Sequence, residues 1–576
     1  MRELTPSARA GLRAICIAVT ILFVGCSQPA RAPAPVHETR AWVAAANPLA
    51  VEAGLEVIER GGSAVDAAIA VQAVLGLVEP QSSGIGGGAF MMYYDARTRR
   101  ITAFNGRETA PRGATAGMFL DERGRPLPRS EATMSGRATG VPGVMRMLEL
   151  AHRRFGQQPW SAAFEPAIRL ARQGFEVSPR LARYLHAPYP QANAPDVRAL
   201  YARPDGSPLQ AGDHFVNDPY ARTLERLAAG GADVLHEGPI AEAIVARTRQ
   251  APLGGTMTIE DLSGYEAEEV EPLCRPYRTR QVCVPPPPSS GVGLLQLLAL
   301  LEQTDIAARG PDDANAWFLF AEASRLMYAD RDRYVADPRF VAVPVAEMLD
   351  PEYVSSRAQL IGETAGPPPE AGAFTGFARV ADTTAEAAGT SHFVVVDRQG
   401  NVVSMTTTIE TFFGSGRVVE GFVLNNQLTD FALDPHDGER IAANAVAGGK
   451  RPRSSMAPVI VLDAQGNFVG ALGSPGGNAI LAYNAKALLA TLGWGLDLQR
   501  AFDLPNLIAR SGAFTGETER FAPPVLGALA SRGVVVQPTR GEESGLHGVF
   551  VGSQGELGGA ADTRREGVAR SLDVSP

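Results

Sequence analysis

The chain holds none of the familiar motifs for nucleophilic, phosphate or zinc chemistry. No G-x-x-x-x-G-K-[ST], H-E-x-x-H or G-x-S-x-G pattern occurs. The eight histidines are scattered, and none lies within helical reach of another. His392 falls on a predicted strand, where we expect a structural hydrogen bond rather than a catalytic base. Spacing alone does not exclude a histidine triad, but nothing in the sequence indicates one.

Chemistry without histidine is available to a nucleophile at a chain N-terminus. A free α-amino group titrates near pH 8, roughly two to three units below a lysine amine, so it can act as a base on its own side-chain hydroxyl. Thr390 follows Gly389 at the point where a weakly periodic segment (363–388) gives way to a strand. Glycine tolerates the strained backbone that presents a scissile carbonyl to the next hydroxyl. The many threonines of the chain leave this, from composition alone, one hypothesis among several.

A glycine-rich segment invites a nucleotide-binding interpretation, which we reject. Residues 84–89 (GIGGGA) match the G-x-G-x-x-A fingerprint. That fingerprint requires a strand before it and a helix after it. Here the predicted order is helix, glycines, strand.

Composition predicts a globular protein that does not bind nucleic acid. Of the 576 residues, 45% are hydrophobic, while Gly (61) and Pro (43) stay below the share typical of low-complexity chains. The formal net charge of −9 gives no basic footprint for nucleic acid.

The elements that must position Thr390 are helical early in the chain and stranded later. Predicted helices cover residues 48–60, 63–78, 140–176, 218–250 and 311–330. Predicted strands include 89–96, 101–105, 391–396 and 402–409, with a hairpin over 457–473. Residues 363–388 are expected to be exposed and mobile. Helices on strand-rich sheets predict an α+β or α/β/β/α layered domain.

The first residues are typical of an export signal. Arg2, Arg9 and Arg13 flank an apolar run of eleven residues, too short to span a membrane as a helix. A glycine followed by Cys26 resembles a bacterial lipobox. We therefore expect a signal peptide over 1–25, acylation of Cys26, a flexible tether over 26–40 and a membrane-anchored periplasmic protein. An ordinary secretory peptide cut elsewhere is the alternative.

Cys274 and Cys283 flank a predicted short hairpin. An exported protein meets oxidising conditions, so a disulfide and two separate buried thiols both remain open. Neither cysteine has the Cys/His neighbours of a zinc site.

Ordered segments across residues 44–568 resemble the γ-glutamyltransferase (glutathione hydrolase) family of N-terminal-nucleophile hydrolases. They are ANPLAVEAGLEVIERGGSAVDAAIAVQAVLGLVEPQSSGIGGGAF, NGRETAP, PPPPSSG, GTSHFVVVDRQGNVVSMTTTIETFFGSG, LNNQLTDF, KRPRSSMAP, GSPGG and GGAADTRREG. The resemblance implies a four-layer αββα sandwich made as one precursor. It also implies cleavage between Gly389 and Thr390 into a large subunit (41–389) and a small subunit (390–576). A homologue that keeps the fold without cleavage is the alternative.

The resemblance also assigns catalytic roles. Thr390 is implied as the nucleophile and its liberated amine as the general base. Thr408 matches a second threonine that hydrogen-bonds the nucleophile. Gly476 and Gly477 match the backbone N–H donors to the oxyanion.

A clamp for the donor's zwitterion is implied in the same way. Arg107, Ser454 and Ser455 match the groups that bind the α-carboxylate. Asp430 and Gln427 match groups that hold the ammonium.

Two departures from the family pattern bear on the donor. Glu410 stands where many members have an asparagine that contacts the ammonium. It could pair with an ammonium through charge, or favour other γ-linked acyl donors. The segment 431–453 also looks shorter than the lid-bearing members' segment, which implies a more open site.

The expected activity is hydrolysis of γ-glutamyl amides such as glutathione, or transfer to amino acids and peptides, with no metal or organic cofactor. The alternatives are an acylase for glutaryl-type or poly-γ-glutamate donors and a non-catalytic envelope binding protein.

Overall fold

The computed structural model describes residues 40–377, 379–382, 384–438, 440–539 and 544–572. The expected signal peptide, Cys26 and almost all of the tether therefore lie outside the described residues. Among the helices of the described ranges, none is both long and apolar enough to cross a membrane. All elements below belong to one unit, residues 38–576.

A seven-stranded antiparallel sheet carries the predicted cleavage site. Its spatial order is β22 (Val568–Leu572), β1 (Ala41–Ala45), β9 (Gly389–Val396), β10 (Val402–Glu410), β2 (Gly88–Asp95), β3 (Arg100–Asn105), β6 (Glu268–Val270). Strands from the earlier and later parts of the chain share this sheet, so the predicted helical and stranded parts do not form separate domains.

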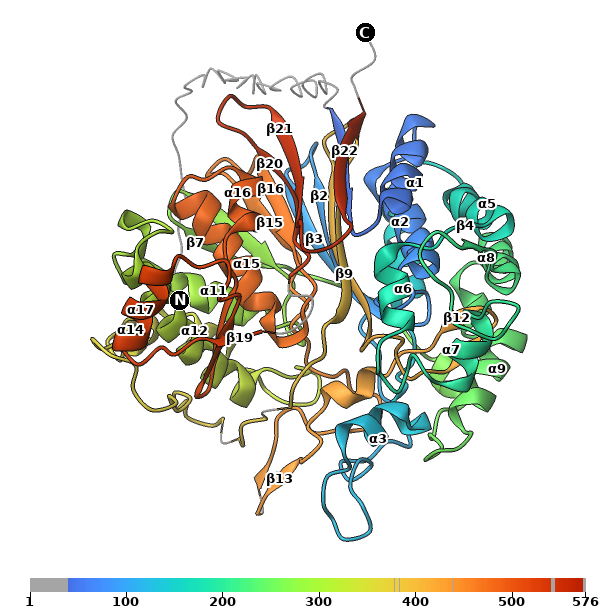
Figure 1. The fold of residues 1–576 in the computed structure, drawn as a ribbon, viewed down its shortest axis with the longest axis horizontal. Helices are drawn as coiled ribbons and strands as arrows, with labels where there is room; N and C mark the ends of the chain where they lie inside the picture. Colours follow the sequence, from blue (N-terminus) through green and yellow to red (C-terminus); the bar gives the residue numbers. More distant parts are fainter. Residues whose placement is uncertain (1–39, 378, 383, 439, 540–543, 573–576) are drawn as a thin grey trace, which may run out of the picture. The chain divides into compact units, whose positions relative to one another are not determined.

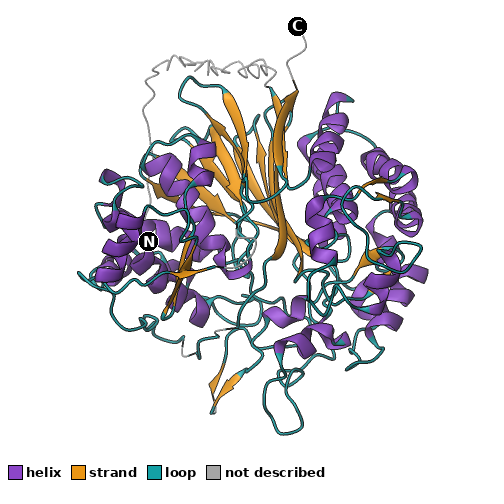
Figure 2. Ribbon diagram, viewed as in Figure 1, coloured by secondary structure: helices purple, strands orange, loops and turns teal. Residues whose placement is uncertain are grey.

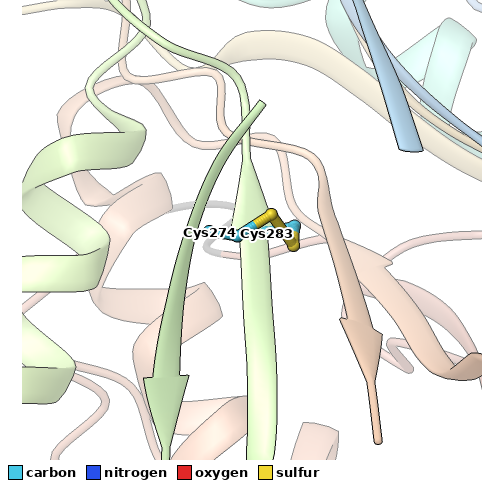
Figure 3. Close-up of a disulfide and its surroundings, with 2 residues drawn as sticks. All are labelled: Cys274 and Cys283. Atoms are coloured by element: carbon cyan, nitrogen blue, oxygen red, sulfur yellow. A yellow bond between two sulfur atoms is a disulfide. The ribbon is translucent and has the colours of Figure 1, made fainter. Parts of the chain in front are cut away.

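A six-stranded antiparallel sheet packs against the first. Its order is β21 (Leu557–Ala561), β20 (His547–Val551), β16 (Phe468–Gly473), β15 (Val459–Leu462), β8 (Arg280–Val284), β7 (Leu273–Tyr277). Cys274 and Cys283 lie directly opposite each other on β7 and β8 and form a disulfide (Figure 3). The apolar layer between the sheets includes Val394 and Val396 of one sheet and Ile460 and Ala471 of the other.

Helices cover the outer faces of the two sheets (Figures 1 and 2). The first sheet is covered by a group that includes α1 (Pro48–Glu59), α2 (Ala64–Val78), α4 (Val144–Phe155), α5 (Glu165–Gln173), α8 (Asp218–Gly230) and α9 (Gly238–Thr248). The second is covered by α11 (Gly291–Glu302), α12 (Ala314–Tyr334) and α15 (Ile480–Leu488), with α16 (Leu498–Asp503) at its edge. This is the predicted α+β arrangement in four layers.

Shorter elements complete the described chain. The helices are α3 (Arg129–Met134), α6 (Pro179–Leu185), α7 (Pro195–Leu200), α10 (Ile259–Ser263), α13 (Val345–Met348), α14 (Pro351–Ala358) and α17 (Pro523–Ser531). Small ladders join β4 (Phe175–Glu176) with β5 (His214–Phe215), β11 (Val418–Val419) with β12 (Phe422–Val423), and β13 (His436–Asp437) with β14 (Arg440–Ile441). A further sheet joins β17 (Leu507–Arg510), β18 (Ala513–Gly516) and β19 (Gln537–Pro538).

The predicted second helix shows how local sequence fixes an element. Ser63 accepts a hydrogen bond from the Asp66 N–H, and the Asp66 carboxylate accepts one from the Ser63 N–H, which completes a capping box. Every residue of α2 is buried. The small side chains of this helix therefore serve close packing, as its composition indicates.

Two predictions require correction. The helical stretches at 140–176 and 218–250 are interrupted by loops and single 3-10 turns, because Gly156, Gly174 and Gly231 end their helices. The described part of 363–388 has no helix and only an isolated bridge at Val380, as its weak periodicity predicts. Its last three residues are half-buried, however, and the Glu386 side chain is only 5% exposed because ion pairs hold its carboxylate.

Candidate active site

The two threonines implied as catalytic lie directly opposite each other. The β9–β10 register pairs Thr390 with Thr408, and both are buried. Thr390 Oγ1 donates to Thr408 Oγ1 at 3.1 Å, and Thr408 Oγ1 donates to the Gly389 carbonyl at 2.5 Å. The Glu410 N–H donates to the same Thr408 oxygen at 2.8 Å. Thr408 therefore links the Thr390 hydroxyl to the carbonyl of the peptide bond that precedes Thr390.

A β-bulge directs the side chain that follows. The register shifts between Thr408 and Glu410, and Glu410 has a φ of +80°. This left-handed conformation is costly for a residue with a Cβ and persists only where surrounding contacts impose it. Glu410 is thereby aimed into the site rather than across the ladder.

The Glu410 carboxylate is held by three donors. Oε1 accepts from Arg129 Nη2 at 2.8 Å and from the Ala387 N–H at 3.1 Å. Oε2 accepts a short hydrogen bond from Asn426 Nδ2. The Glu410 side chain is 2% exposed and that of Arg129 is 32% exposed. Arg129, at the start of α3, thus reaches the site from its solvent side.

Arg107 and Asp430 form a buried ion pair. Arg107 Nη2 donates to Asp430 Oδ2 at 2.6 Å and to the Arg453 carbonyl at 2.8 Å. Gln427 Nε2 donates to the same Asp430 oxygen at 2.6 Å. Burial raises the pKa of Asp430 well above its usual range, with repulsion from Glu410 adding to it and Arg107 opposing it. Three predicted clamp residues are therefore in mutual contact.

Ser454 and Ser455 lie beside a second buried ion pair. Glu386 Oε2 accepts from the Ser455 N–H at 2.9 Å, and its Oε1 accepts from Arg331. Arg331 also donates to Ser455 Oγ at 2.7 Å. Burial alone would raise the pKa of Glu386, but Arg331 and Arg453 lower it to about 2. A carboxylate thus already occupies the position next to the predicted carboxylate-binding serines.

The glycine pair opens a short turn ahead of α15. Gly476 and Gly477 have φ values of +134° and +54°, which favour glycine. A Cβ on Gly477 would lie 2.3 Å from the Glu386 carbonyl oxygen and 2.4 Å from that of Ala387. Gly477 therefore approaches the chain just ahead of the predicted cut.

One cavity gathers most of the predicted residues. It is lined by nine of them: Arg107, Thr390, Thr408, Glu410, Gln427, Asp430, Ser454, Ser455 and Gly477. Gly476 does not line it, and its Cβ position faces Tyr483 instead. Gly389 does not line the cavity either and is the first residue of β9. The geometry thus brings the predicted nucleophile, its hydroxyl partner and the predicted clamp residues to one place.

His392 is hydrogen-bonded within the inter-sheet layer, as expected, and not directed at the cavity. Its Nδ1 lies 2.9 Å from Thr406 Oγ1, and the ring is fully buried. Burial lowers the pKa of His392 well below its usual value, and the neighbouring His547 lowers it further.

Four residues that hold the site together were not predicted from the sequence. Glu386, Arg331 and Arg453 form the buried ion-pair cluster, and Arg129 holds Glu410. The only local signal was position: Glu386 lies three residues before Gly389, and Arg453 directly precedes the serine pair. Arg129 and Arg331 are distant in sequence, so only the fold reveals them.

Comparisons with known proteins show the family to which the chain belongs. The model of the family described as Gamma-glutamyltranspeptidase matches residues 50–572. A "Glutathione hydrolase proenzyme" of Bacillus subtilis (strain 168) is 35% identical over 545 residues, covering 92% of this chain and 91% of that protein. An "Acylase ACY 1 proenzyme" of Pseudomonas sp. (strain V22) is 35% identical over 546 residues, covering 92% and 94%. The crystal structure of cephalosporin acylase from Bacillus halodurans superposes with a TM-score of 0.82 at 27% identity, covering 93% of this chain and 97% of that one.

Proposed function

Because the chain belongs to the gamma-glutamyltranspeptidase family of N-terminal-nucleophile hydrolases, we propose that it cuts itself between Gly389 and Thr390 and then acts on γ-glutamyl amides such as glutathione. The observation that carries this proposal is the chain of hydrogen bonds from Thr390 through Thr408 to the Gly389 carbonyl.

The cut follows from that chain of contacts. Thr390 Oγ attacks the Gly389 carbonyl carbon while its proton passes to the departing Thr390 nitrogen. Thr408 stabilises the carbonyl oxygen through the bond it already donates. The C–N bond breaks and an ester forms. Water then hydrolyses the ester, which leaves a Gly389 carboxylate and a free Thr390 amine and divides the chain into residues up to 389 and residues 390–576.

Turnover uses the same hydroxyl with the new amine as its base. Thr390 Oγ attacks the γ-carbonyl of the donor, and the Gly476 and Gly477 N–H groups receive the oxyanion. The amine takes the hydroxyl proton and returns one to the leaving amine. The γ-glutamyl ester on Thr390 is then released to water or to an amino acid or peptide.

The donor's α-carboxylate and its ammonium are proposed to bind to two different sets of side chains. Arg107, Ser454 and Ser455 are proposed to bind the α-carboxylate, and Asp430 with Gln427 the ammonium. Support comes from their joint position around the Thr390 cavity. Glu410 is proposed to add a second carboxylate on the ammonium side.

An acylase for glutaryl-type donors is the second candidate, and one observation favours it. Both carboxylates expected to hold an ammonium already have guanidinium partners: Glu410 has Arg129 and Asp430 has Arg107. A site neutralised in this way accepts a donor without an amine at lower cost. A relative with the printed name acylase is as similar as a glutathione hydrolase.

The first experiment tests the cut. Mature protein on a denaturing gel should give two fragments, the smaller beginning Thr-Ser-His-Phe by N-terminal sequencing. Thr390→Ala should give one uncut, inactive chain. A wild-type chain that stays intact would instead support a non-catalytic binding protein, and a cut, active Thr390→Ala variant would refute the role of Thr390.

The second experiment identifies the donor. Chromogenic γ-glutamyl and glutaryl anilides differ only in the α-amino group that Asp430, Gln427 and Glu410 would hold. A higher kcat/KM for the γ-glutamyl anilide supports the first function, and the reverse order supports the acylase. Adding an acceptor dipeptide then separates transfer from hydrolysis.

Export and lipid anchoring are proposed from the sequence of the first residues. The basic flank, the apolar run and Cys26 support a signal peptide that leaves an acylated cysteine. Mass spectrometry of the mature N-terminus tests this, since it would show Cys26 as the first residue with the mass of its acyl chains added. At least two such anchoring groups are needed for firm membrane binding. Cys26→Ala should release the protein from the membrane fraction.

A further inference from the structure

The residues just before the predicted cut cross the candidate site. The Glu386 N–H donates to Asn478 Oδ1 at 2.6 Å, and the Ala387 N–H donates to Glu410 Oε1 at 3.1 Å. The carbonyl oxygens of Glu386 and Ala387 lie so close to Gly477 that they leave no room for a Cβ atom there. The cavity that remains beside Thr390 measures about 10 Å³, room for about one water molecule. In the uncut chain a donor therefore has no space.

The Glu386 carboxylate is held as a bound ligand would be. It accepts from the Ser455 N–H at 2.9 Å and from Arg331 Nη2, and Arg453 Nε lies 3.6 Å from it. Its side chain is 5% exposed. Main-chain and guanidinium donors converge on it in the manner of a carboxylate-binding site.

Glu386 and Ala387 also place a negatively charged group and a hydrogen-bond donor on two sides of the cavity. A carboxylate meets Ser455, and an N–H donor meets Glu410. A γ-glutamyl donor carries a carboxylate and an ammonium on one carbon, and the proposed function assigns these to the same two sides of the cavity. Glu386 and Ala387 thus copy the arrangement expected of the donor.

We propose that Glu386 takes the place of the donor's α-carboxylate in the uncut chain, and that Arg331 is a donor-binding residue which receives that carboxylate once the cut segment has left. This inference rests on the proposed function for the donor's carboxylate, but not on whether the donor also has an amine.

The Arg331 guanidinium is already fixed in an orientation that suits binding of a carboxylate. It is fully buried and is fixed by Ser290 Oγ at 2.9 Å, Asp332 Oδ1 at 2.9 Å and Ser455 Oγ at 2.7 Å. Both Glu386 and Ser455 line the cavity, so departure of Glu386 leaves the Arg331 Nη2 beside the Ser455 hydroxyl without that carboxylate. A buried guanidinium that has lost one partner gains more from a new anion than an exposed one does.

The first test uses the uncut full-length Thr390→Ala chain and calorimetric titration with glutarate and with L-glutamate. Adding Glu386→Ala should tighten binding by on the order of tenfold or more, since a charged competitor is removed. Glu370→Ala, which removes an exposed carboxylate from the same segment, is the matched control and should change nothing. Equal affinities for the Glu386 and Glu370 variants would overturn the proposal.

The second test uses the cut enzyme and three anilides: γ-glutamyl, glutaryl and 4-aminobutanoyl, of which the last lacks the carboxylate. Arg331→Lys keeps the charge but loses the fork geometry. KM should rise on the order of tenfold for the first two donors and stay unchanged for the third. A uniform rise for all three would contradict a carboxylate role. The wild-type preference between γ-glutamyl and glutaryl donors tests the proposed function separately, because Arg331 is expected to serve both.

Discussion

Arg129 and Glu410 join a solvent-side helix to the strand that carries Thr408. The guanidinium Nη2 donates at 2.8 Å to a carboxylate that is almost fully buried. Glu410 immediately follows the β-bulge and has a left-handed backbone, so the ion pair helps to hold both the bulge and the hydroxyl ahead of it in place. The contact therefore supports the strained backbone on which both Thr408 and Glu410 lie.

Removing Arg129 should destabilise the fold, and a double-mutant cycle measures by how much. Arg129→Gln leaves the Glu410 carboxylate buried without its guanidinium. We expect a loss of about 1–3 kcal/mol in the free energy of unfolding, less than for a fully buried pair because Arg129 is a third exposed. Chemical denaturation of Arg129→Gln, Glu410→Gln and the double variant gives the coupling. Strict additivity of the two single effects would show that the contact contributes nothing.

Thr408 should be needed for the cut. Thr408→Val preserves shape but removes the hydroxyl that accepts from Thr390 and donates to Gly389. Loss of the hydroxyl that orients Thr390 and stabilises the Gly389 carbonyl oxygen predicts processing slower by about 10²–10³-fold. A time course on a denaturing gel measures this. Thr408→Ser keeps the hydroxyl and should process at close to the wild-type rate, and cutting of the valine variant at that rate would contradict the assignment.

Gly477 should tolerate no side chain in the uncut protein. Gly477→Ala would place a methyl group 2.3 Å from the Glu386 carbonyl oxygen in addition to imposing a positive φ on alanine. We expect slower cleavage together with a lower melting temperature. Gly495→Ala isolates the backbone effect, since Gly495 has a φ of +69° and open space around its Cβ position. Equal losses in the two variants would mean that strain alone, and not the approach of Glu386, is responsible.

Stability should fall as the solution is acidified, because buried histidines resist protonation. Burial lowers the pKa of His547 to about 3, so below pH 6.5 the unfolded chain binds a proton that the folded chain does not. The neutral His547 ring therefore adds its full contribution to the free energy of unfolding above pH 6.5. As the pH falls from 6.5 to about 3, that free energy drops by up to about 1.4 kcal/mol per pH unit for this one group. His547→Gln should flatten the dependence of unfolding free energy on pH within this window. An unchanged slope would show that His547 is protonated at little cost in the fold.

The sequence by itself determined most of the elements and indicated the family. The capping box of Ser63 and Asp66, the β-branched runs around Thr390 and the glycine stops are local patterns, so they could be predicted without a fold. Ordered motifs also indicated the family and named the residues that line the cavity. Continuous helices over 140–176 and 218–250 were expected wrongly, since apolar periodicity continues through glycines that end a helix.

The tertiary structure alone decided which of these residues meet. Thr408 is eighteen positions after Thr390, and only the register of the β9–β10 hairpin places it opposite. The same holds for Arg129 and Arg331, whose partners are 281 and 55 residues away in the chain. Charges at such separations pair through the packing of sheets and helices, which no local pattern encodes. The burial of Glu386 likewise depends on long-range ion pairs and not on the composition of the segment around it.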